Sequence, residues 1–285
     1  MSDRRTLEHQ VAGAAVEAWW RASGDNDIAI PLGVVAALTL VRRPAGYDFE
    51  EFILKSTREE FIAVLNELWT MFAVTRPELF IRVATPFFRW LEDEETTENR
   101  RAAAHATGRA AVRAGLFQIA GTSEKAIEGD VLGLVYQELR HAKARKEGGD
   151  FFTPSDAADL GASLKLKDLS EIRPGMSFLD DQGGTGGMLR ATAKILRDNG
   201  LDPREMWWYG NDVDPVAVAA MAVNVHVWDL GNQVILGVAN ILTEPDWYKR
   251  AAAEQDRASR YRNMRLAAAR SLAMERDFTP KVQPE

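Results

Sequence analysis

Four glycines within five positions, next to paired carboxylates, are the residues of this sequence best suited to chemistry. The stretch Phe178–Leu189 reads FLDDQGGTGGML, with Asp180 and Asp181 directly after an apolar run. A backbone without side chains lets a ligand approach the main chain closely. Glycine-rich turns that follow a strand and open a helix serve this purpose in parallel α/β sheets. The pattern therefore predicts a ligand-binding turn at residues 180–187.

A further acid follows a second apolar run, where residues 210–215 read GNDVDP. An acid at the end of a second strand can accept both hydroxyls of a ribose, and Asp212 has this position. Asp180 and Asp181 beside the turn would repel the diphosphate that a dinucleotide places on a helix N-terminus. S-adenosylmethionine has no phosphate, and its cationic sulfonium and amino group suit carboxylates. We therefore favour S-adenosyl-L-methionine as the cofactor, with a nicotinamide dinucleotide as an alternative.

The elements that must position these residues are short strands that alternate with helices. Apolar runs and helical periodicity predict strands over 176–180, 206–211 and 234–238, and helices over 187–199 and 216–228. Alternation of this kind predicts parallel strands with right-handed crossovers. The fold class is therefore α/β, with an N-terminal helical domain followed by a partial Rossmann-like sheet.

The first half of the chain has the spacing of helices. Apolar residues three and four apart predict helices over 7–20, 28–42, 58–73, 78–91, 100–119 and 130–146. Thr57 and Glu60 have the spacing of a capping box. The uncharged run 28–41 is shorter than the ~20 residues that cross a bilayer, so we expect a buried helix there.

Composition narrows the cofactors and partners. The chain has no cysteine, which excludes disulfides and cysteine-based zinc sites and fits a cytoplasmic protein. The four histidines lack metal-ligand spacing, so we expect no metal, and the N-terminus lacks the pattern of a signal peptide, so we expect no membrane. A net charge of −7 argues against a broadly basic surface. Residues 249–285 nevertheless form an Arg/Ala-rich helical tail, either a solvated helix or a phosphate-binding face.

Four segments in order give the sequence a family resemblance. They read DVLGLVY at 130–136, GDFFTP at 149–154, DDQGGTGG at 180–187 and GNDVDP at 210–215. This set resembles the N6-adenine DNA methyltransferases, and among them the modification subunits of type I restriction systems. The family turn reads Asp-Pro-Ala-Cys-Gly-Ser-Gly-Gly, so this chain departs from it at residues 181–183.

The resemblance implies a cofactor site and a partner. It implies that the glycine turn holds the methionine part of S-adenosylmethionine, that the second acid binds its ribose, and that the FTP segment forms a wall of the pocket. The residues concerned are Phe152, Thr153, Pro154, Asp180, Gly184, Thr185, Gly186, Gly187 and Asp212. DNA is the implied substrate, in restriction-modification. The implied organisation is a helical domain at 1–127, a partial methyltransferase domain at 128–248 and the tail at 249–285.

The family's catalytic tetrapeptide, Asn/Asp-Pro-Pro-Tyr/Phe, has no match here, because no Pro-Pro occurs in these 285 residues. The nearest string, TEPDWY at 243–248, fits a helix start better. No catalytic residue is assigned, and the sequence leaves open whether the chain is one half of a split enzyme or a catalytically inactive interaction protein. The first strand would then lie at an open edge of the sheet. Three explanations remain: a second chain completes the sheet, the tail covers the edge, or the protein is a degenerate remnant.

Overall fold

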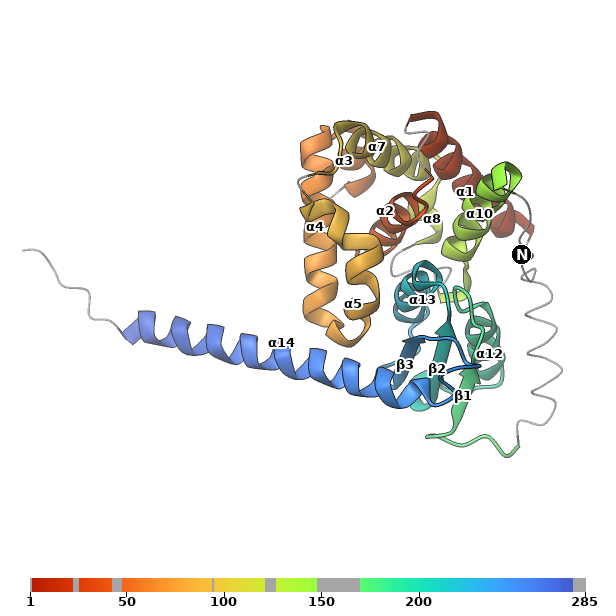
Figure 1. The fold of residues 1–285 in the computed structure, drawn as a ribbon, viewed down its shortest axis with the longest axis vertical. Coiled ribbons are helices and arrows are strands. Elements are labelled where there is room, and N and C mark those ends of the chain that lie inside the picture. The colour runs from red at the N-terminus through yellow and green to blue at the C-terminus, as the bar shows by residue number, and fades with distance from the viewer. Residues whose placement is uncertain are drawn as a thin grey trace, which may run out of the picture.

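The computed structural model describes residues 2–22, 26–42, 48–93, 95–120, 127–147 and 170–278 (Figure 1). Helices make up the first half of the chain, and a three-stranded parallel sheet flanked by helices follows. This arrangement confirms the α/β fold class.

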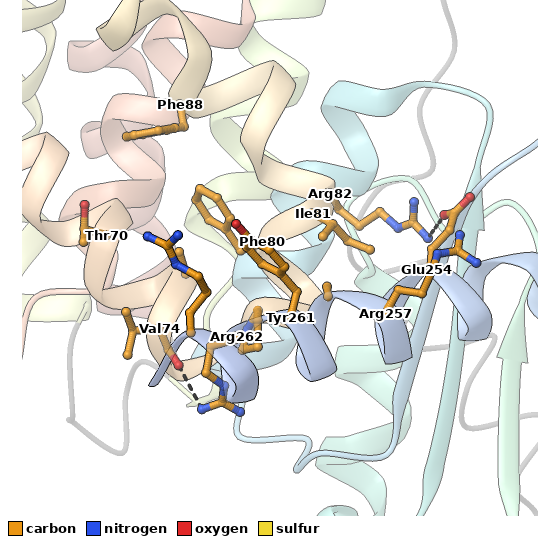
Figure 2. Close-up of a pocket in the computed structure, with 14 residues that line it drawn as sticks. Thr70, Val74, Phe80, Ile81, Arg82, Phe88, Glu254, Arg257, Tyr261 and Arg262 are labelled. Carbon is orange, nitrogen blue, oxygen red and sulfur yellow. Dashed lines mark hydrogen bonds and ion pairs between the residues drawn. The ribbon is translucent and has the colours of Figure 1, made fainter. Parts of the chain in front are cut away.

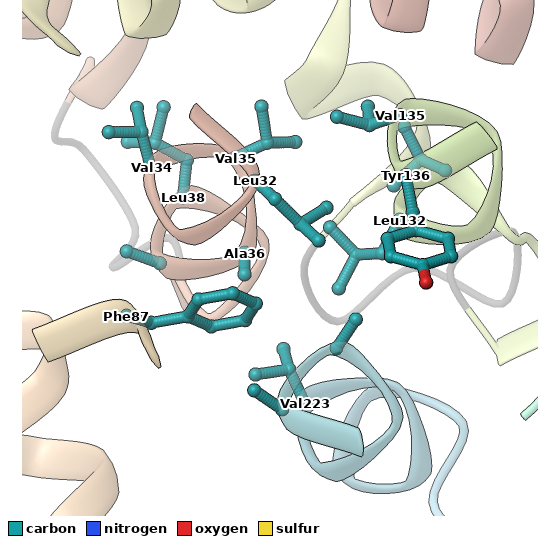
Figure 3. Packing of buried hydrophobic residues seen from close by; sticks show 14 of the residues in the cluster. Leu32, Val34, Val35, Ala36, Leu38, Phe87, Leu132, Val135, Tyr136 and Val223 are labelled. Carbon is teal, nitrogen blue, oxygen red and sulfur yellow. The ribbon is translucent and has the colours of Figure 1, made fainter. Parts of the chain in front are cut away.

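The helical half is built around one apolar helix. Its elements are α1 (Ser2–Ala22), α2 (Ala29–Thr39), α3 (Phe49–Lys55), α4 (Arg58–Thr75), α5 (Pro77–Val83), the π-helical turn η1 (Ala84–Phe88), α6 (Arg89–Glu92), α7 (Glu98–Arg113), α8 (Leu116–Ile119) and α10 (Val131–Glu147). Every residue of α2 after Ala29 is buried, which confirms the predicted buried helix. Figure 3 shows α2 packed between η1, α10 and the later helix α13 (Pro215–Val227).

Three details of the helical half differ from the sequence prediction. The helix expected over 78–91 is interrupted by η1, and the helix expected over 100–119 breaks at Gly115, whose φ is 98°. The short helix α3 was not predicted. The capping box was predicted correctly, because Thr57 Oγ1 accepts from the Glu60 N–H at 3.2 Å and Glu60 accepts from the Thr57 N–H at 2.7 Å.

The sheet contains β1 (Ser177–Asp180), β2 (Trp207–Asp212) and β3 (Val234–Val238), in the order β1-β2-β3 with all strands parallel. Helix α12 (Gly187–Asp198) and the 3₁₀ turn η2 (Pro203–Glu205) lie between the first two strands, and α13 joins the second to the third. The predicted strands match the observed ones to within one residue at each end. The parallel arrangement brings Asp180 and Asp212 to the same edge of the sheet.

Helix α13 connects the sheet to the helical half. It packs on β2 and β3 and also on α2 and α5. One cluster of buried side chains runs without interruption from Val11 in α1 to Leu236 in β3. The helical half therefore packs, through α13, against the sheet that carries the predicted site.

The tail forms one long helix, α14 (Trp247–Phe278), which packs on β3 and α5 and then extends away from the body of the molecule (Figure 1). Its Gln255 occupies the outer edge of β3, where its amide donates to Val234 O and accepts from Leu236 N, both at 3.2 Å. Arg82 of α5 donates to Leu236 O at 2.8 Å. The outer edge of β3 is thus closed by side chains.

The opposite edge of the sheet has different surroundings. Among the described residues, β1 pairs with β2 alone, and Leu179 is 58% exposed. The described part of the tail covers the edge of β3, so it does not explain the open edge of β1. In the part of the chain that the structure describes, no helix has both the length and the apolar character needed to cross a membrane.

Candidate functional site

The glycine turn is tied to the end of β2 by backbone hydrogen bonds. Gly183 N donates to Asn211 O at 2.8 Å, and Gly186 N donates to Gly183 O at 2.7 Å. Gly184 N donates to the Asp212 carboxylate at 2.9 Å. The predicted turn and the predicted ribose-binding acid are therefore in direct contact, at the carboxyl edge where parallel sheets bind ligands.

Glycine is favoured at different positions of the turn for different physical reasons. A Cβ on Gly186 would lie 3.0 Å from Trp228 and 3.1 Å from Met221, and one on Gly183 would lie 2.9 Å from Met221. Gly186 also has a φ of 96°, so both its backbone and its surroundings favour glycine, whereas a Cβ on Gly183 would crowd only the flexible end of the Met221 side chain. Gly184 has a φ of 54°, and a Cβ there would meet no atom within 4 Å. The turn is therefore open at Gly184, where a ligand can reach the backbone.

Asp212 lies half-buried beside this opening. One carboxylate oxygen accepts the Gly184 N–H, and the other accepts the Asp214 N–H at 2.9 Å. An ionised carboxylate has about four acceptor positions, so Asp212 keeps capacity for the hydroxyl groups of a ligand. Its orientation is fixed by two backbone donors from two different loops.

The paired acids after β1 have different surroundings. The Asp181 carboxylate accepts a hydrogen bond at 2.8 Å from the indole N–H of Trp247, at the start of α14. Asp180 stays beside the turn, where the Gln182 N–H lies 3.4 Å from its carboxylate. The carboxylate of Asp180 is therefore the one of the pair placed next to the glycines.

Asn211, buried at the end of β2, joins the ends of all three strands. Its side-chain nitrogen donates to Asp181 O at 3.1 Å and to Ala239 O at 2.9 Å. Its side-chain oxygen is buried and has no hydrogen-bond partner in the described part of the chain. This residue fixes the loops after β1 and β3 relative to one another.

Helix α10 supports the site from the other side. The Tyr136 hydroxyl donates to Asp214 at 2.7 Å, and Arg140 lies 3.6 Å from the same carboxylate. Burial and this hydrogen bond raise the pKa of Tyr136, so it remains a neutral donor. Asp214 also caps α13 by accepting from Val216 N at 2.8 Å.

The turn itself is held by α13 and the start of α10. Asn224 donates to Thr185 O at 2.9 Å, and Trp228 donates to Gly129 O at 2.6 Å. Asp130 accepts from Gly133 N at 3.0 Å, which starts α10. Asn224 also lies 3.5 Å from the Asp130 carboxylate, so it links the start of α10 to the turn.

The structure brings together most of the residues predicted for the cofactor. Asp180, Gly184, Thr185 and Asp212 lie at one edge of the sheet, with Gly186 and Gly187 at the start of α12. The predicted wall, Phe152, Thr153 and Pro154, lies outside the described residues.

Sequence reasoning missed three supporting residues. Asp214 stands before Pro215 in the usual pattern of a helix N-cap, so its capping role was readable. Asn211 and Trp247 had no local signal, because their partners lie up to 66 residues away. The string at 243–248 is a helix start, as predicted, since α14 begins at Trp247.

Comparison with known proteins gives one family match. Residues 127–257 match the family model N-6 DNA Methylase. This match confirms the resemblance to N6-adenine DNA methyltransferases over that segment and supports a DNA methyltransferase-like function. The comparison with curated proteins finds no match.

Among the solved structures that are similar to this chain is one of low sequence identity. It is the methyltransferase subunit of a type I restriction-modification system from Streptococcus thermophilus, with 17% sequence identity and a TM-score of 0.49. The similarity covers 86% of this chain and 60% of that subunit, so this chain spans about 60% of the subunit's length.

Proposed function

We propose that residues 128–248 bind S-adenosyl-L-methionine and form the cofactor-binding part of an N6-adenine DNA methyltransferase. The observation that carries the proposal is the contact of Asp212 with Gly184, 2.9 Å apart at the carboxyl edge of a parallel sheet. The match of residues 127–257 to the N-6 DNA Methylase family model supports it. The sheet is then the first part of a Rossmann-like fold, and residues 1–127 are a helical domain that supports it.

The residues at the turn fit this cofactor. The opening above Gly184 gives access to the backbone, and Asp180 and Asp212 provide negative charge beside the turn. S-adenosylmethionine supplies an electrophilic methyl group when it is bound. Asp180 would face its cationic methionine part, and Asp212 would accept hydrogen bonds from its ribose. The remaining tasks of this chain are to hold the cofactor and to keep the turn rigid.

We also propose that a second chain completes the sheet beside β1 and supplies the contacts to the target adenine of DNA. The support is the contrast between the two edges of the sheet. The edge of β3 is closed by Gln255 and Arg82, whereas β1 leaves Leu179 exposed and pairs on one side alone among the described residues. Unpaired apolar strand edges tend to bind another strand. The complete enzyme would work in the cytoplasm, in restriction-modification.

Calorimetric titration of the purified chain with S-adenosylmethionine tests the cofactor proposal. We expect saturable binding that weakens about tenfold or more in Asp212→Ala, which corresponds to a loss of at least about 1.4 kcal/mol. Asp256→Ala, an exposed change on α14, serves as the matched control and should bind like the unmodified protein. Absence of binding by folded protein, or equal affinity in Asp212→Ala, would refute the proposal.

Transfer of a labelled methyl group to DNA tests the second-chain proposal. We expect no methylated adenine with this chain alone, and methylation when a chain that carries the Asn-Pro-Pro-Tyr motif is added. Adenine methylation by this chain alone would show that a second chain is not needed. Cofactor binding without methylation in any mixture would favour a non-catalytic, cofactor-binding interaction protein.

A further inference from the structure

An open groove of about 910 Å³ lies between α5 and α14 (Figure 2). These two helices lie on the side of the sheet that β3 borders, away from β1 (Figure 1). The end of α4, α5 and η1 form one wall, and the middle of α14 forms the other. The lining of the groove includes Val74, Phe80, Arg257, Tyr261, Arg262 and Arg265. The groove shares no residue with the proposed cofactor site, so a ligand can bind here whether or not the chain binds S-adenosylmethionine.

The charge of the groove is strongly positive. Glu254 is the acid in its lining, and this carboxylate already binds Arg82 at 2.7 Å and Arg250 at 2.9 Å. Within the described residues, Arg257 and Arg265 have no acidic partner. Two cations of the rim are therefore available to a ligand.

A third cation is attached to the opposite wall. Arg262 donates to the backbone oxygen of Val74 at 3.1 Å, and Figure 2 shows this bond bridging α14 to the end of α4. A backbone carbonyl does not neutralise the guanidinium charge. The bond therefore fixes the width of the groove at this end and leaves it cationic.

The floor of the groove is apolar. Phe80 and Phe88 meet edge to face with ring centroids 5.6 Å apart, and Pro77, Ile81 and Ala258 lie beside them. Tyr261, which lines the groove, is 59% exposed. Exposed apolar surface rimmed by charge is typical of sites that bind other proteins. Aromatic and aliphatic side chains of this kind line grooves that bind amphipathic helices.

The wall formed by α14 has a regular spacing. Arg257, Tyr261 and Arg265 are four residues apart, so they form one stripe along the helix, about 12 Å from first to last. Carboxylates two turns apart on another helix are separated by about the same distance. Apolar residues of that helix would then lie against Phe80 and Tyr261. The groove matches an amphipathic helix with an acidic flank in both charge and spacing.

We propose that this groove binds an acidic amphipathic helix of a partner protein. A nucleic acid strand would also meet the arginines, but its sugar-phosphate backbone would leave the aliphatic part of the floor uncovered. The exposed apolar residues beside the arginines therefore favour a protein helix over a nucleic acid.

Two synthetic helical peptides of about 16 residues test the proposal. Both carry the same stripe of leucines at positions i, i+3, i+4 and i+7, and they differ in having glutamate or lysine on the flanks. Fluorescence anisotropy with the full chain should show saturable binding of the glutamate peptide and about tenfold or more weaker binding of the lysine peptide.

Substitutions on α14 locate the binding. The double change Arg257→Glu with Arg265→Glu should weaken the glutamate peptide about tenfold, and Arg257→Gln with Arg265→Gln should weaken it by a smaller factor. Arg260→Glu is the matched control, since Arg260 is exposed, pairs with Asp256 and does not line the groove. Circular dichroism of each variant checks that α14 remains helical.

Three results would overturn the proposal. They are no binding of the glutamate peptide, equal binding of the two peptides, and binding that the double change leaves intact. A single-stranded DNA oligonucleotide is the third probe. If the oligonucleotide binds in dependence on Arg257 and Arg265 while the glutamate peptide does not bind, the groove is a nucleic-acid site instead.

Discussion

The carboxylate of Asp212 accepts the backbone N–H of Gly184 at 2.9 Å, although the two residues lie 28 positions apart in the chain. This bond joins the loop after β1 to the loop after β2. The same carboxylate accepts the Asp214 N–H, and Asp214 in turn binds Tyr136. Asp212 thus orders the turn, and in the proposed function it also contacts the cofactor, so its removal should affect both stability and binding.

Asp212→Ala should lower the free energy of unfolding by about 2 kcal/mol, because two backbone N–H groups lose a charged acceptor. Urea denaturation measures this change. Asp212→Asn keeps an acceptor oxygen and should recover part of the stability. If both variants unfold like the unmodified protein, the bond to Gly184 does not stabilise the turn.

Gly184→Ala and Gly186→Ala should separate binding from stability. At Gly184 a methyl group meets no neighbour but suffers a positive φ, which costs about 1 kcal/mol, and it covers the open backbone. At Gly186 the methyl group also meets Trp228 and Met221, so the cost should reach about 3 kcal/mol. Thermal unfolding and S-adenosylmethionine titration measure the two effects. Equal loss of stability at both positions would contradict the different roles assigned to them.

The sequence predicted the elements whose signals are local. The glycine run, the strand at 176–180 and the acid at Asp212 were readable because apolar runs, glycine and acids mark strand ends and turns within a few residues. The break between α7 and α8 was not predicted. Gly115 marks its place in the sequence, but the left-handed conformation of this residue depends on the packing around it.

Features that depend on distant contacts were not readable. Asp181 looked like a cofactor-facing acid, and its partner Trp247 lies 66 residues away. The groove needs α5 and α14, which are far apart in the chain, and no periodicity in either helix indicates the other. Tertiary packing decides these pairings, and one sequence contains no separate signal for them.

Trp247→Phe should show the coupling between α14 and the glycine turn. The change removes the indole donor to Asp181 and leaves space in a site that is 1% exposed, so it should cost about 2 kcal/mol. A double-mutant cycle with Asp181→Ala isolates the hydrogen bond, for which we expect about 1 kcal/mol. Additive effects of the two changes would mean that the bond contributes nothing.

His226 should make the protein less stable in acid. Burial, followed by the charges of Arg76 and Arg42, lowers the pKa of this histidine from 6.5 to about 4. The unfolded chain therefore binds a proton that the folded chain does not bind between these values. Stability from this group is complete above about pH 7 and is lost as the pH falls through 6.5 toward 4. The expected loss from about pH 7.5 to about pH 5.0 is about 2 kcal/mol.

Urea denaturation at these two pH values checks this prediction. His226→Asn keeps an acceptor for Arg76, whose guanidinium lies 3.3 Å from His226 Nδ1, but cannot take up a proton. The variant should therefore lose less stability on acidification than the unmodified protein. His9→Asn, at an exposed position of α1, is the control. The same loss in the unmodified protein and in His226→Asn would assign the pH dependence to other groups, of which His105 is one, because burial lowers its pKa as well.

The two edges of the sheet should respond differently to substitution. Gln255→Ala leaves the N–H of Leu236 and the carbonyl of Val234 buried without their partner, so the free energy of unfolding should fall by about 2 kcal/mol. Leu179→Lys, on the open edge of β1, should change it by no more than about 0.5 kcal/mol. The lysine should also raise the temperature at which the protein aggregates, because a charge on an open edge blocks pairing between copies. Asn263→Ala, exposed on α14, controls for changes in that helix. A large loss of stability in Leu179→Lys would mean that β1 is already covered within this chain. That result would contradict the proposal that a second chain pairs with β1.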